Sequence, residues 1–205
     1  MKKMYSTLVT LVASLALAPL ARAEVQVGSP APDFSLTDTH GRGYRLSDYR
    51  GKIVVLEWYN PDCPFVGKHY RSGNMQELQK EYTAKGVIWL TVDSSAPGEQ
   101  GNYPAETLNQ ISNKVGAIRT ALLLDPDGKV GHLYDAKTTP DMYIIDSKGS
   151  LVYRGAIDNK SNTNEADIKT ATNYVRQALD AVMAGKPVPV SATRPYGCTV
   201  KYAGR

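Results

Sequence analysis

The stretch that decides the fold is Glu57-Trp58-Tyr59-Asn60-Pro61-Asp62-Cys63-Pro64-Phe65-Val66, which follows directly on the apolar run Ile53–Leu56. The apolar run predicts a central strand buried on both faces, and Pro64 is a favoured first residue of a helix. Cys63 therefore lies where a strand gives way to a helix. The unpaired N–H groups at a helix start favour a thiolate over a thiol, which suits a redox nucleophile. The spacing is that of a Cys-x-x-Cys redox turn, except that Val66 stands in place of the second cysteine.

The segments on either side of this stretch alternate between strand and helix patterns. The expected strands are Phe34–Leu36 with Tyr44–Leu46 as a hairpin, Ile53–Trp58, Val87–Val92, Ala121–Leu124, and Met142–Asp146 with Leu151–Ile157 as a second hairpin. The expected helices run from Pro64 toward Tyr82 with a kink at Gly73, over Ala105–Val115, and over Glu165–Ala184 with Asn164 and Gly185 as caps. Asp125-Pro126-Asp127-Gly128 predicts a turn. This order predicts an α/β domain with a mixed central β-sheet, flanked by helices and preceded by an N-terminal β-hairpin.

Residues 1–23 have the features of a signal peptide. Lys2 and Lys3 form a positive start, Leu8–Leu20 is apolar, and Ala21-Arg22-Ala23 is a small-x-small cleavage site. The apolar run is too short to span a membrane, which takes about 20 residues. We therefore expect cleavage after Ala23 and a periplasmic or secreted protein without a membrane anchor. Residues 24–185 would form one domain, and residues 186–205 a tail that is rich in Pro and Gly.

The charge pattern and the motifs of the chain argue against a nucleic-acid partner, a metal and a cofactor. The chain has 24 Lys and Arg against 20 Asp and Glu, for a net charge of +4, and the two signs are interleaved. Without a basic run, no nucleic-acid partner is expected. Asp125 and Asp127 lack the later ligands of a calcium loop, and no metal, phosphate-binding or Ser/His/Asp motif is present. The sequence therefore predicts neither a metal nor a cofactor.

Three further segments carry a resemblance to a known family. Val27-Gly28-Ser29-Pro30-Ala31-Pro32-Asp33-Phe34-Ser35-Leu36 and Leu46-Ser47-Asp48-Tyr49-Arg50-Gly51-Lys52 are similar to the opening of redoxin domains. These domains form the thioredoxin-fold group that includes alkyl hydroperoxide reductase and thiol-specific antioxidant proteins. Thr139-Pro140-Asp141-Met142-Tyr143-Ile144-Ile145-Asp146 resembles the thioredoxin-fold segment whose proline is cis and lies beside the active cysteine. The resemblance covers almost the whole chain up to the tail. It implies a thioredoxin-like fold and a thiol-dependent oxidoreductase with Cys63 as its nucleophile.

The chain departs from both well-known branches of this group. Leu56 and Asn60 stand where peroxiredoxins keep the proline and threonine of their peroxide site, and Pro140 stands where they keep an arginine. Val66 replaces the second cysteine of thioredoxins. The substrate therefore stays open between a peroxide and a protein or small-molecule disulfide. The resemblance implies that Asn60, Pro64, Thr139 and Pro140 line the substrate groove.

Glu57 lies six residues before Cys63, where thioredoxins keep a buried acid that relays protons. The resemblance implies that its carboxylate acts as a base in thiol exchange, whereas the pattern alone is equally compatible with a solvent-facing strand residue. His69 is expected on a helical face other than that of Cys63, at the surface. Lys68 and Arg71 are expected on a solvated helix face.

Cys198 is the other cysteine of the chain. The tail from Gly185 to Cys198 could span roughly 43 Å at about 3.3 Å per residue, so Cys198 can reach Cys63. The bond could be a resolving disulfide in a redox cycle. It could also be a permanent staple, which the entropy model values at about 4–5 kcal/mol for a loop of this length.

The sequence thus predicts an exported thiol oxidoreductase. Cys63 would attack a peroxide, giving a sulfenic acid, or a disulfide, giving a mixed disulfide. Cys198 or an external thiol reductant would resolve the product. The alternative is a non-catalytic thioredoxin-fold binding protein in which a Cys63–Cys198 disulfide is structural.

Overall fold

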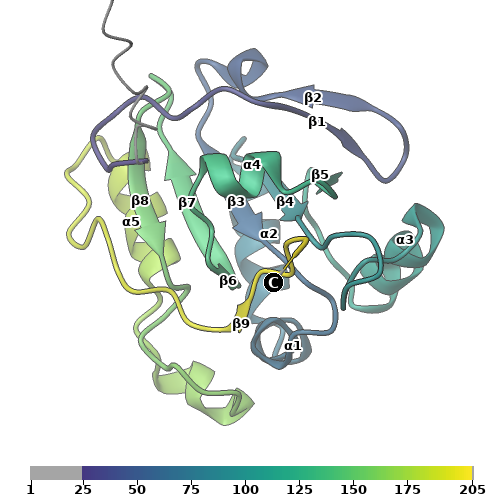
Figure 1. The fold of residues 1–205 in the computed structure, drawn as a ribbon. Coiled ribbons are helices and arrows are strands. Elements are labelled where there is room, and N and C mark those ends of the chain that lie inside the picture. Colours follow the sequence, from purple (N-terminus) through teal and green to yellow (C-terminus); the bar gives the residue numbers. More distant parts are fainter. Residues whose placement is uncertain (1–24, 205) are drawn as a thin grey trace, which may run out of the picture.

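A computed structural model describes residues 25–204 of the chain (Figure 1). Its centre is a seven-stranded sheet in the order β2-β1-β5-β4-β3-β7-β8. Strands β3, β4 and β5 are parallel to one another, and the remaining neighbours pair antiparallel. The strands are β1 (Ser35–Asp38), β2 (Gly43–Arg45), β3 (Val54–Trp58), β4 (Ile88–Asp93), β5 (Ala121–Leu124), β7 (Asp141–Ile145) and β8 (Leu151–Gly155). The predicted mixed sheet with an N-terminal hairpin is confirmed.

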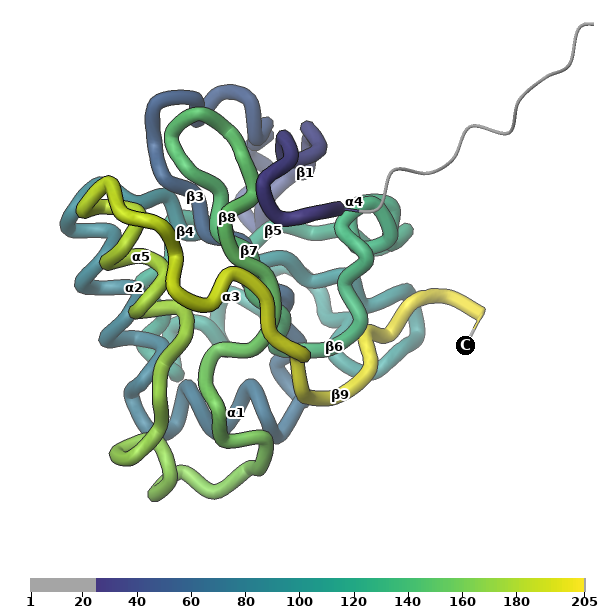
Figure 2. The backbone as a smooth tube through the Cα atoms, turned by 90° about the vertical axis from the view of Figure 1, so that its left-hand side faces the viewer, coloured from purple at the N-terminus to yellow at the C-terminus, as the bar shows by residue number. Residues whose placement is uncertain are grey.

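Helices cover both faces of the sheet, with α2 and α5 on one face and α4 on the other (Figures 1 and 2). The helical segments are η1 (Leu46–Tyr49), α1 (Pro64–Arg71), α2 (Asn74–Ala84), α3 (Ala105–Lys114), α4 (Lys129–Leu133), η2 (Glu165–Thr170) and α5 (Tyr174–Met183). Strand β3 is buried along its whole length because it lies between β4 and β7 in the sheet, with helices over both faces. Alternate residues of β3 therefore enter two separate hydrophobic cores. Leu56 and Trp58 pack in one core, and Val55 packs in the other.

The helix expected from Pro64 toward Tyr82 is two helices. Gly73 has a φ of +80°, a left-handed conformation that ordinary residues rarely adopt, and α2 begins directly after it. The prediction located the irregularity at Gly73 but underestimated it as a kink. The consequence for the site is that α1 is a short, separate helix whose start carries Cys63.

The single helix expected over Glu165–Ala184 is wrong. The chain forms η2, capped by Asn164, and then α5, capped by Asn173. Between them Ala171 is extended, the backbone N–H of Thr172 donates to the side chain of Asn159, and the N–H of Tyr174 donates to the carbonyl of Ile157. These bonds to the segment after β8 replace the bonds that a continuous helix would make.

The segment after α5, which is rich in Pro and Gly, is packed along the molecule. Figure 2 follows this yellow segment past β8 to β9 (Cys198–Thr199), which pairs antiparallel with β6 (Thr138–Thr139). Farther on, Val200 and Tyr202 are buried, and Tyr202 stacks on His132 of α4 at 4.0 Å between ring centroids. The turn expected over Asp125–Gly128 is present, since the N–H of Gly128 donates to the carbonyl of Asp125. Helix α4 begins directly after it, where the Asp125 side chain accepts the N–H groups of Val130 and Gly131.

The expected signal peptide lies outside the described residues. Within residues 25–204, every helix is too short or too polar to cross a bilayer.

Candidate active site

Cys63 is the N-cap of α1, in the turn that follows β3, as the sequence predicts. Its backbone N–H donates to the carbonyl of Asn60, and its own carbonyl accepts the N–H of Gly67 in the first helical turn. The thiol donates to the carbonyl oxygen of Thr139, 2.9 Å away. Only 1% of the Cys63 surface is exposed, so the sulfur is held between the helix start and the segment before β7.

The turn before Cys63 is braced by Asn60. Its amide donates to the carbonyl of Gln100 at 2.8 Å, and its side-chain oxygen accepts the N–H of Asp62 at 2.9 Å. Asn60 is buried, so its polar atoms hold the turn instead of facing an open groove as predicted. Pro64, the first residue of α1, is exposed beside the buried thiol.

The Thr139–Pro140 peptide is cis, as predicted. Both residues are buried, and Thr139 contacts the two cysteines in different ways. Its carbonyl accepts the thiol of Cys63, and its backbone is paired in register with Cys198 across β6 and β9. The structure therefore brings together three predicted site residues, Cys63, Thr139 and Cys198, although 135 residues separate the two cysteines.

Both thiols are reduced in this structure. Burial, followed by the hydrogen bond and charge of Cys63, raises the pKa of the half-buried Cys198 thiol to about 12. Cys198 therefore keeps its proton and can offer it to the sulfur of Cys63.

Gly197 allows Cys198 to come this close. A Cβ atom at Gly197 would lie 2.0 Å from the carbonyl oxygen of Thr139, far inside van der Waals contact. The φ of Gly197 is +146°, which also favours glycine. Glycine at position 197 therefore lets the tail pass directly against the cis-proline segment. Sequence reasoning did not assign Gly197 a role, although its place directly before the second cysteine is a usable signal.

Glu57 is fully buried, which removes the solvent-facing alternative. Its Oε1 accepts the hydroxyl of Tyr70, and its Oε2 accepts N–H or O–H groups of Gln79, Trp89 and Thr91. These four donors come from α1, α2 and β4 and hold the carboxylate under the β3–α1 junction. None of them is a sulfur, so a role for Glu57 as a base remains a prediction.

His69 and Lys68 do not lie on the surface as expected, because both are fully buried. Lys68 lies 3.8 Å from Asp158 and donates to the carbonyl of Lys160 at 2.6 Å. His69 is hydrogen-bonded to the hydroxyl of Tyr196 at 3.1 Å. Helix α1 therefore buries two polar residues against segments that follow it by some 90 or more positions in the chain, which its own spacing could not reveal.

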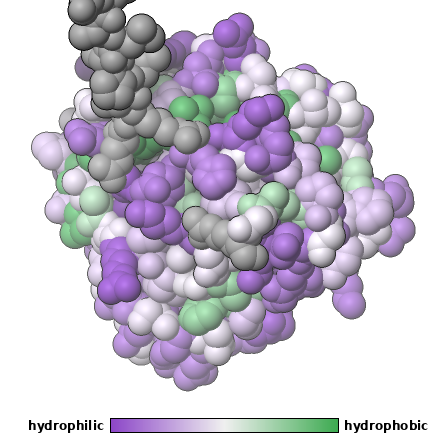
Figure 3. All heavy atoms as spheres, viewed as in Figure 1, coloured by the Kyte–Doolittle hydropathy of each residue, from purple (hydrophilic) through white to green (hydrophobic). Residues whose placement is uncertain are grey.

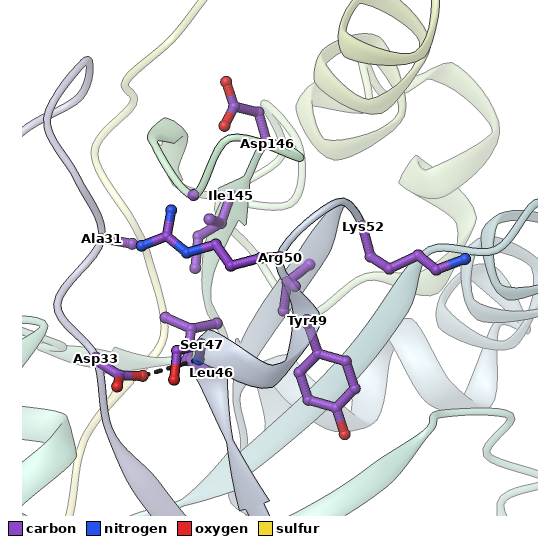
Figure 4. Close-up of a pocket in the computed structure, with 11 residues that line it drawn as sticks. Ala31, Asp33, Leu46, Ser47, Tyr49, Arg50, Lys52, Ile145 and Asp146 are labelled. Atoms are coloured by element: carbon purple, nitrogen blue, oxygen red, sulfur yellow. Dashed lines mark hydrogen bonds between the residues drawn. The ribbon is translucent and has the colours of Figure 1, made fainter.

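Other surface features lie away from the thiols. A small pocket of about 20 Å³ sits at the opposite end of β3, between the segment before β1, η1 and the turn after β7. Figure 4 shows Arg50 and Asp33 at this pocket, where Asp33 accepts the N–H of Ser47. On the face shown in Figure 3 the surface is largely hydrophilic, with apolar residues only in small patches. Among residues 25–204, no three metal-ligating side chains lie close enough to hold an ion.

Comparison with known proteins shows the family of the chain. Residues 27–154 match the model of the AhpC/TSA family. The chain is 32% identical over 130 residues to the thiol-disulfide oxidoreductase ResA of Geobacillus kaustophilus (strain HTA426), covering 63% of this chain and 69% of that one. It is 27% identical over 133 residues to ResA of Bacillus subtilis (strain 168), covering 64% and 68%.

Solved structures extend the likeness beyond Arg154. An uncharacterized conserved protein from Geobacillus kaustophilus is 28% identical with a TM-score of 0.72, covering 89% of this chain and 95% of that one. A putative thiol:disulfide interchange protein DsbE from Chlorobium tepidum is 27% identical with a TM-score of 0.52, covering 64% and 85%. The fold and site define a redoxin of the thioredoxin superfamily, a class of thiol-dependent oxidoreductases. The chain belongs to the AhpC/TSA family within that class.

Proposed function

We propose that this protein is an exported thiol–disulfide oxidoreductase in which Cys63 is the nucleophile and Cys198 the resolving thiol. The observation that carries the proposal is the shared contact at Thr139, whose carbonyl accepts the Cys63 thiol and whose backbone pairs with Cys198. This contact supplies from the tail the second thiol that Val66 cannot supply from α1. Sequences named thiol-disulfide oxidoreductases among the relatives support the same class of reaction.

The reaction is balanced by the two cysteines. The thiolate of Cys63 attacks one sulfur of a disulfide, forming a mixed disulfide and releasing the other sulfur as a thiolate that takes up a proton. Cys198 then attacks the sulfur of Cys63, forming the Cys63–Cys198 disulfide and releasing the second substrate thiol with the proton of Cys198. The substrate gains two electrons and the cysteine pair loses two. Two equivalents of an external thiol reductant restore the pair.

The local chemistry favours this order of attack. Cys63 is the N-cap of α1, so its side chain lies at the positive end of the dipole of that helix. The raised pKa of Cys198 keeps that thiol protonated until Cys63 has reacted. Cys198 is thus the later nucleophile and the donor of the proton that leaves with the product.

A disulfide fits the site better than a peroxide. Asn60, which stands at the peroxiredoxin threonine position, uses its side chain within the turn, and Pro140 stands at the arginine position. A peroxide would therefore meet neither of the groups that orient it in peroxiredoxins. The features of residues 1–23 support export to an oxidising compartment, where disulfide substrates form.

Trapping tests the proposal. The Cys198→Ser protein, mixed with a small disulfide such as oxidised glutathione, should accumulate a mixed disulfide at Cys63 that mass spectrometry detects. The wild-type protein should instead give the Cys63–Cys198 bond, and Cys63→Ser should give neither product. If the wild type forms the bond with a potential well below about −300 mV, and Cys198→Ser mainly lowers the melting temperature, the bond is structural and the proposal fails.

A further inference from the structure

Tyr196, two residues before Cys198, enters a buried polar cluster formed by Lys68, His69 and Asp158 (the α1–Asp158 cluster). The Tyr196 hydroxyl donates to Oδ1 of Asp158 at 2.6 Å and is hydrogen-bonded to Nε2 of His69 at 3.1 Å. Its ring lies over the Lys68 ammonium group at 5.4 Å and against Phe65 at 5.9 Å. The tail is thus tied to the helix whose first turn carries Cys63.

The direction of the hydrogen bonds in the cluster is set by its neighbours. The amide nitrogen of Asn74 lies 2.8 Å from Nδ1 of His69, so Nδ1 accepts and Nε2 carries the proton. His69 then donates to the oxygen of Tyr196, and Tyr196 donates to Asp158. Burial lowers the pKa of His69 to about 4. The ring is therefore neutral near neutral pH, as this series of hydrogen bonds requires.

The cluster is costly to leave incomplete. Lys68 and Asp158 are both fully buried, and at 3.8 Å their charges are close without direct contact. The Tyr196 hydroxyl supplies one of the hydrogen bonds that Asp158 accepts at Oδ1, the other coming from the N–H of Lys160. A buried carboxylate that loses a donor keeps its desolvation cost, so undocking of Tyr196 is disfavoured.

We propose that Tyr196 is a positioning residue that latches the tail through the α1–Asp158 cluster and so holds Cys198 against Cys63. The inference rests on the proposed function, because it explains how a thiol from the tail is kept ready to resolve Cys63. The latch also controls the access of substrates to Cys63. Cys63 is 1% exposed beneath the tail, so a disulfide reaches it only when this segment lifts, and Tyr196 sets how often that happens.

The first experiment measures docking of the tail without using the reaction. In a Cys63→Ala protein Cys198 is the sole thiol, and its rate of alkylation by iodoacetamide reports the fraction of time that it is undocked. Tyr196→Phe keeps the ring and removes the hydroxyl, so the rate, normalised to that in urea, should rise about tenfold for the loss of a hydrogen bond to a charged group. Tyr82→Phe is the matched control, since the Tyr82 hydroxyl also donates to a carboxylate, that of Asp180 at 2.7 Å, and this bond joins α2 to α5 instead of the tail to α1.

The second experiment measures the resolving step. Glutathione is placed on Cys63, and the rate at which Cys198 displaces it is followed by mass spectrometry. Tyr196→Phe should slow this displacement, and Tyr82→Phe should not. The inference is overturned if Tyr196→Phe leaves the alkylation rate unchanged, or if both variants raise it equally through general loosening. Failure of the wild type to form any Cys63–Cys198 bond would instead refute the proposed function, while the alkylation test of the latch would still stand.

Discussion

The two cysteines of the site are held in place by very different parts of the molecule. Cys63 stands at the junction of a central buried strand and a helix, and its position is fixed by the same packing that makes the fold. Cys198 stands in a tail that is joined to the body by the β6–β9 pairing, by backbone hydrogen bonds to Arg154, Lys137 and Ala96, and by side-chain anchors such as Tyr196. Cys63 is therefore placed by the packing of the central sheet, whereas Cys198 is placed by contacts of the tail.

This difference changes what the second thiol can do. In a Cys-x-x-Cys turn both sulfurs belong to one helix start, so the second thiol needs no separate segment to bring it to the first. Here position 66 is a valine, 3% exposed, that packs in the same core cluster as Cys63. Cys198, which we propose as the resolving thiol, must instead approach Cys63 from outside α1. Mutations confined to the tail test this comparison.

The largest effect is expected at Gly197, where the two regions cross. Gly197→Val places side-chain atoms on the carbonyl of Thr139 and forces an unfavourable backbone, so the docked tail cannot form. In the Cys63→Ala background, Cys198 should then be alkylated as fast as in the unfolded chain. Circular dichroism should show that the body remains folded.

Gly204→Ala is the control for this variant. Gly204 also has a left-handed φ, +77°, but a Cβ there meets nothing within 4 Å. It should leave Cys198 protected. Protection that survives Gly197→Val would mean that the tail is held by contacts other than the crossing at Thr139.

A second variant removes the difference between the two regions. Val66→Cys restores a thiol one helical turn from Cys63, on the same face of α1. Closing that short loop needs no docking of the tail, so most of the oxidised protein should carry the bond within α1 and leave Cys198 free. Peptide mapping distinguishes the two bonds, and Val66→Ser controls for lost packing. Persistence of Cys63–Cys198 as the main bond would show that the docked tail places its thiol better than the helix can.

The same contrast between body and tail separates what the sequence could predict from what it could not. The apolar run into β3 and the Thr-Pro motif at Thr139 predicted the sheet and the position of Cys63, because burial on both faces and a helix-starting proline are local signals. For Cys198 the sequence predicted only that the tail is long enough to reach Cys63, and it did not predict the pairing of Cys198 with Thr139. Its register depends on the anchors at Tyr196 and Tyr202, whose partners come from distant segments.

Lys68 and His69 show why the rest of the site escaped prediction. A lysine and a histidine on a short helix are expected at the surface unless a partner is known. Their partners are Asp158, Lys160 and Tyr196, which tertiary structure alone brings to α1. The predicted helix over Glu165–Ala184 failed for the same reason, since bonds from Thr172 and Tyr174 to the segment after β8 override a regular helical pattern.

A third prediction concerns how the stability of the body depends on pH through Asp141, which follows the cis proline. Burial is the largest cause that raises the pKa of Asp141 to about 7, and Asp135 adds to it, while Arg154, Tyr143 and the N–H of Lys137 oppose it. The folded state therefore holds this proton more tightly than the unfolded state. The stabilisation is complete below the unfolded pKa near 3.8 and is lost as pH rises through about 7, by about 4 kcal/mol.

Urea unfolding at pH 4 to 8 checks this prediction. Asp141→Asn should lack this part of the pH dependence, so the difference in free energy of unfolding between variant and wild type should change in favour of the variant as pH rises. Other titrating groups act in both proteins and cancel in the difference. A difference that stays constant across this range would show that Asp141 does not carry the proton.

The smallest effect is expected at Glu57, the buried carboxylate beneath the β3–α1 junction. Glutamine has one acceptor and one donor end, so Glu57→Gln must point an NH₂ group either at Tyr70 or at the donors of Gln79, Trp89 and Thr91. The free energy of unfolding should fall by about 1–3 kcal/mol. Glu81→Gln, at a half-exposed ion pair with Lys85 and Arg176, should cost less than about 1 kcal/mol. Because no donor to Glu57 is a sulfur, the pH profile of Cys63 alkylation in the Cys198→Ser protein should keep its shape in the Glu57→Gln variant. A profile that loses its acidic limb would give Glu57 the role of base that the sequence predicted, and would show that the body of the site supplies chemistry as well as position.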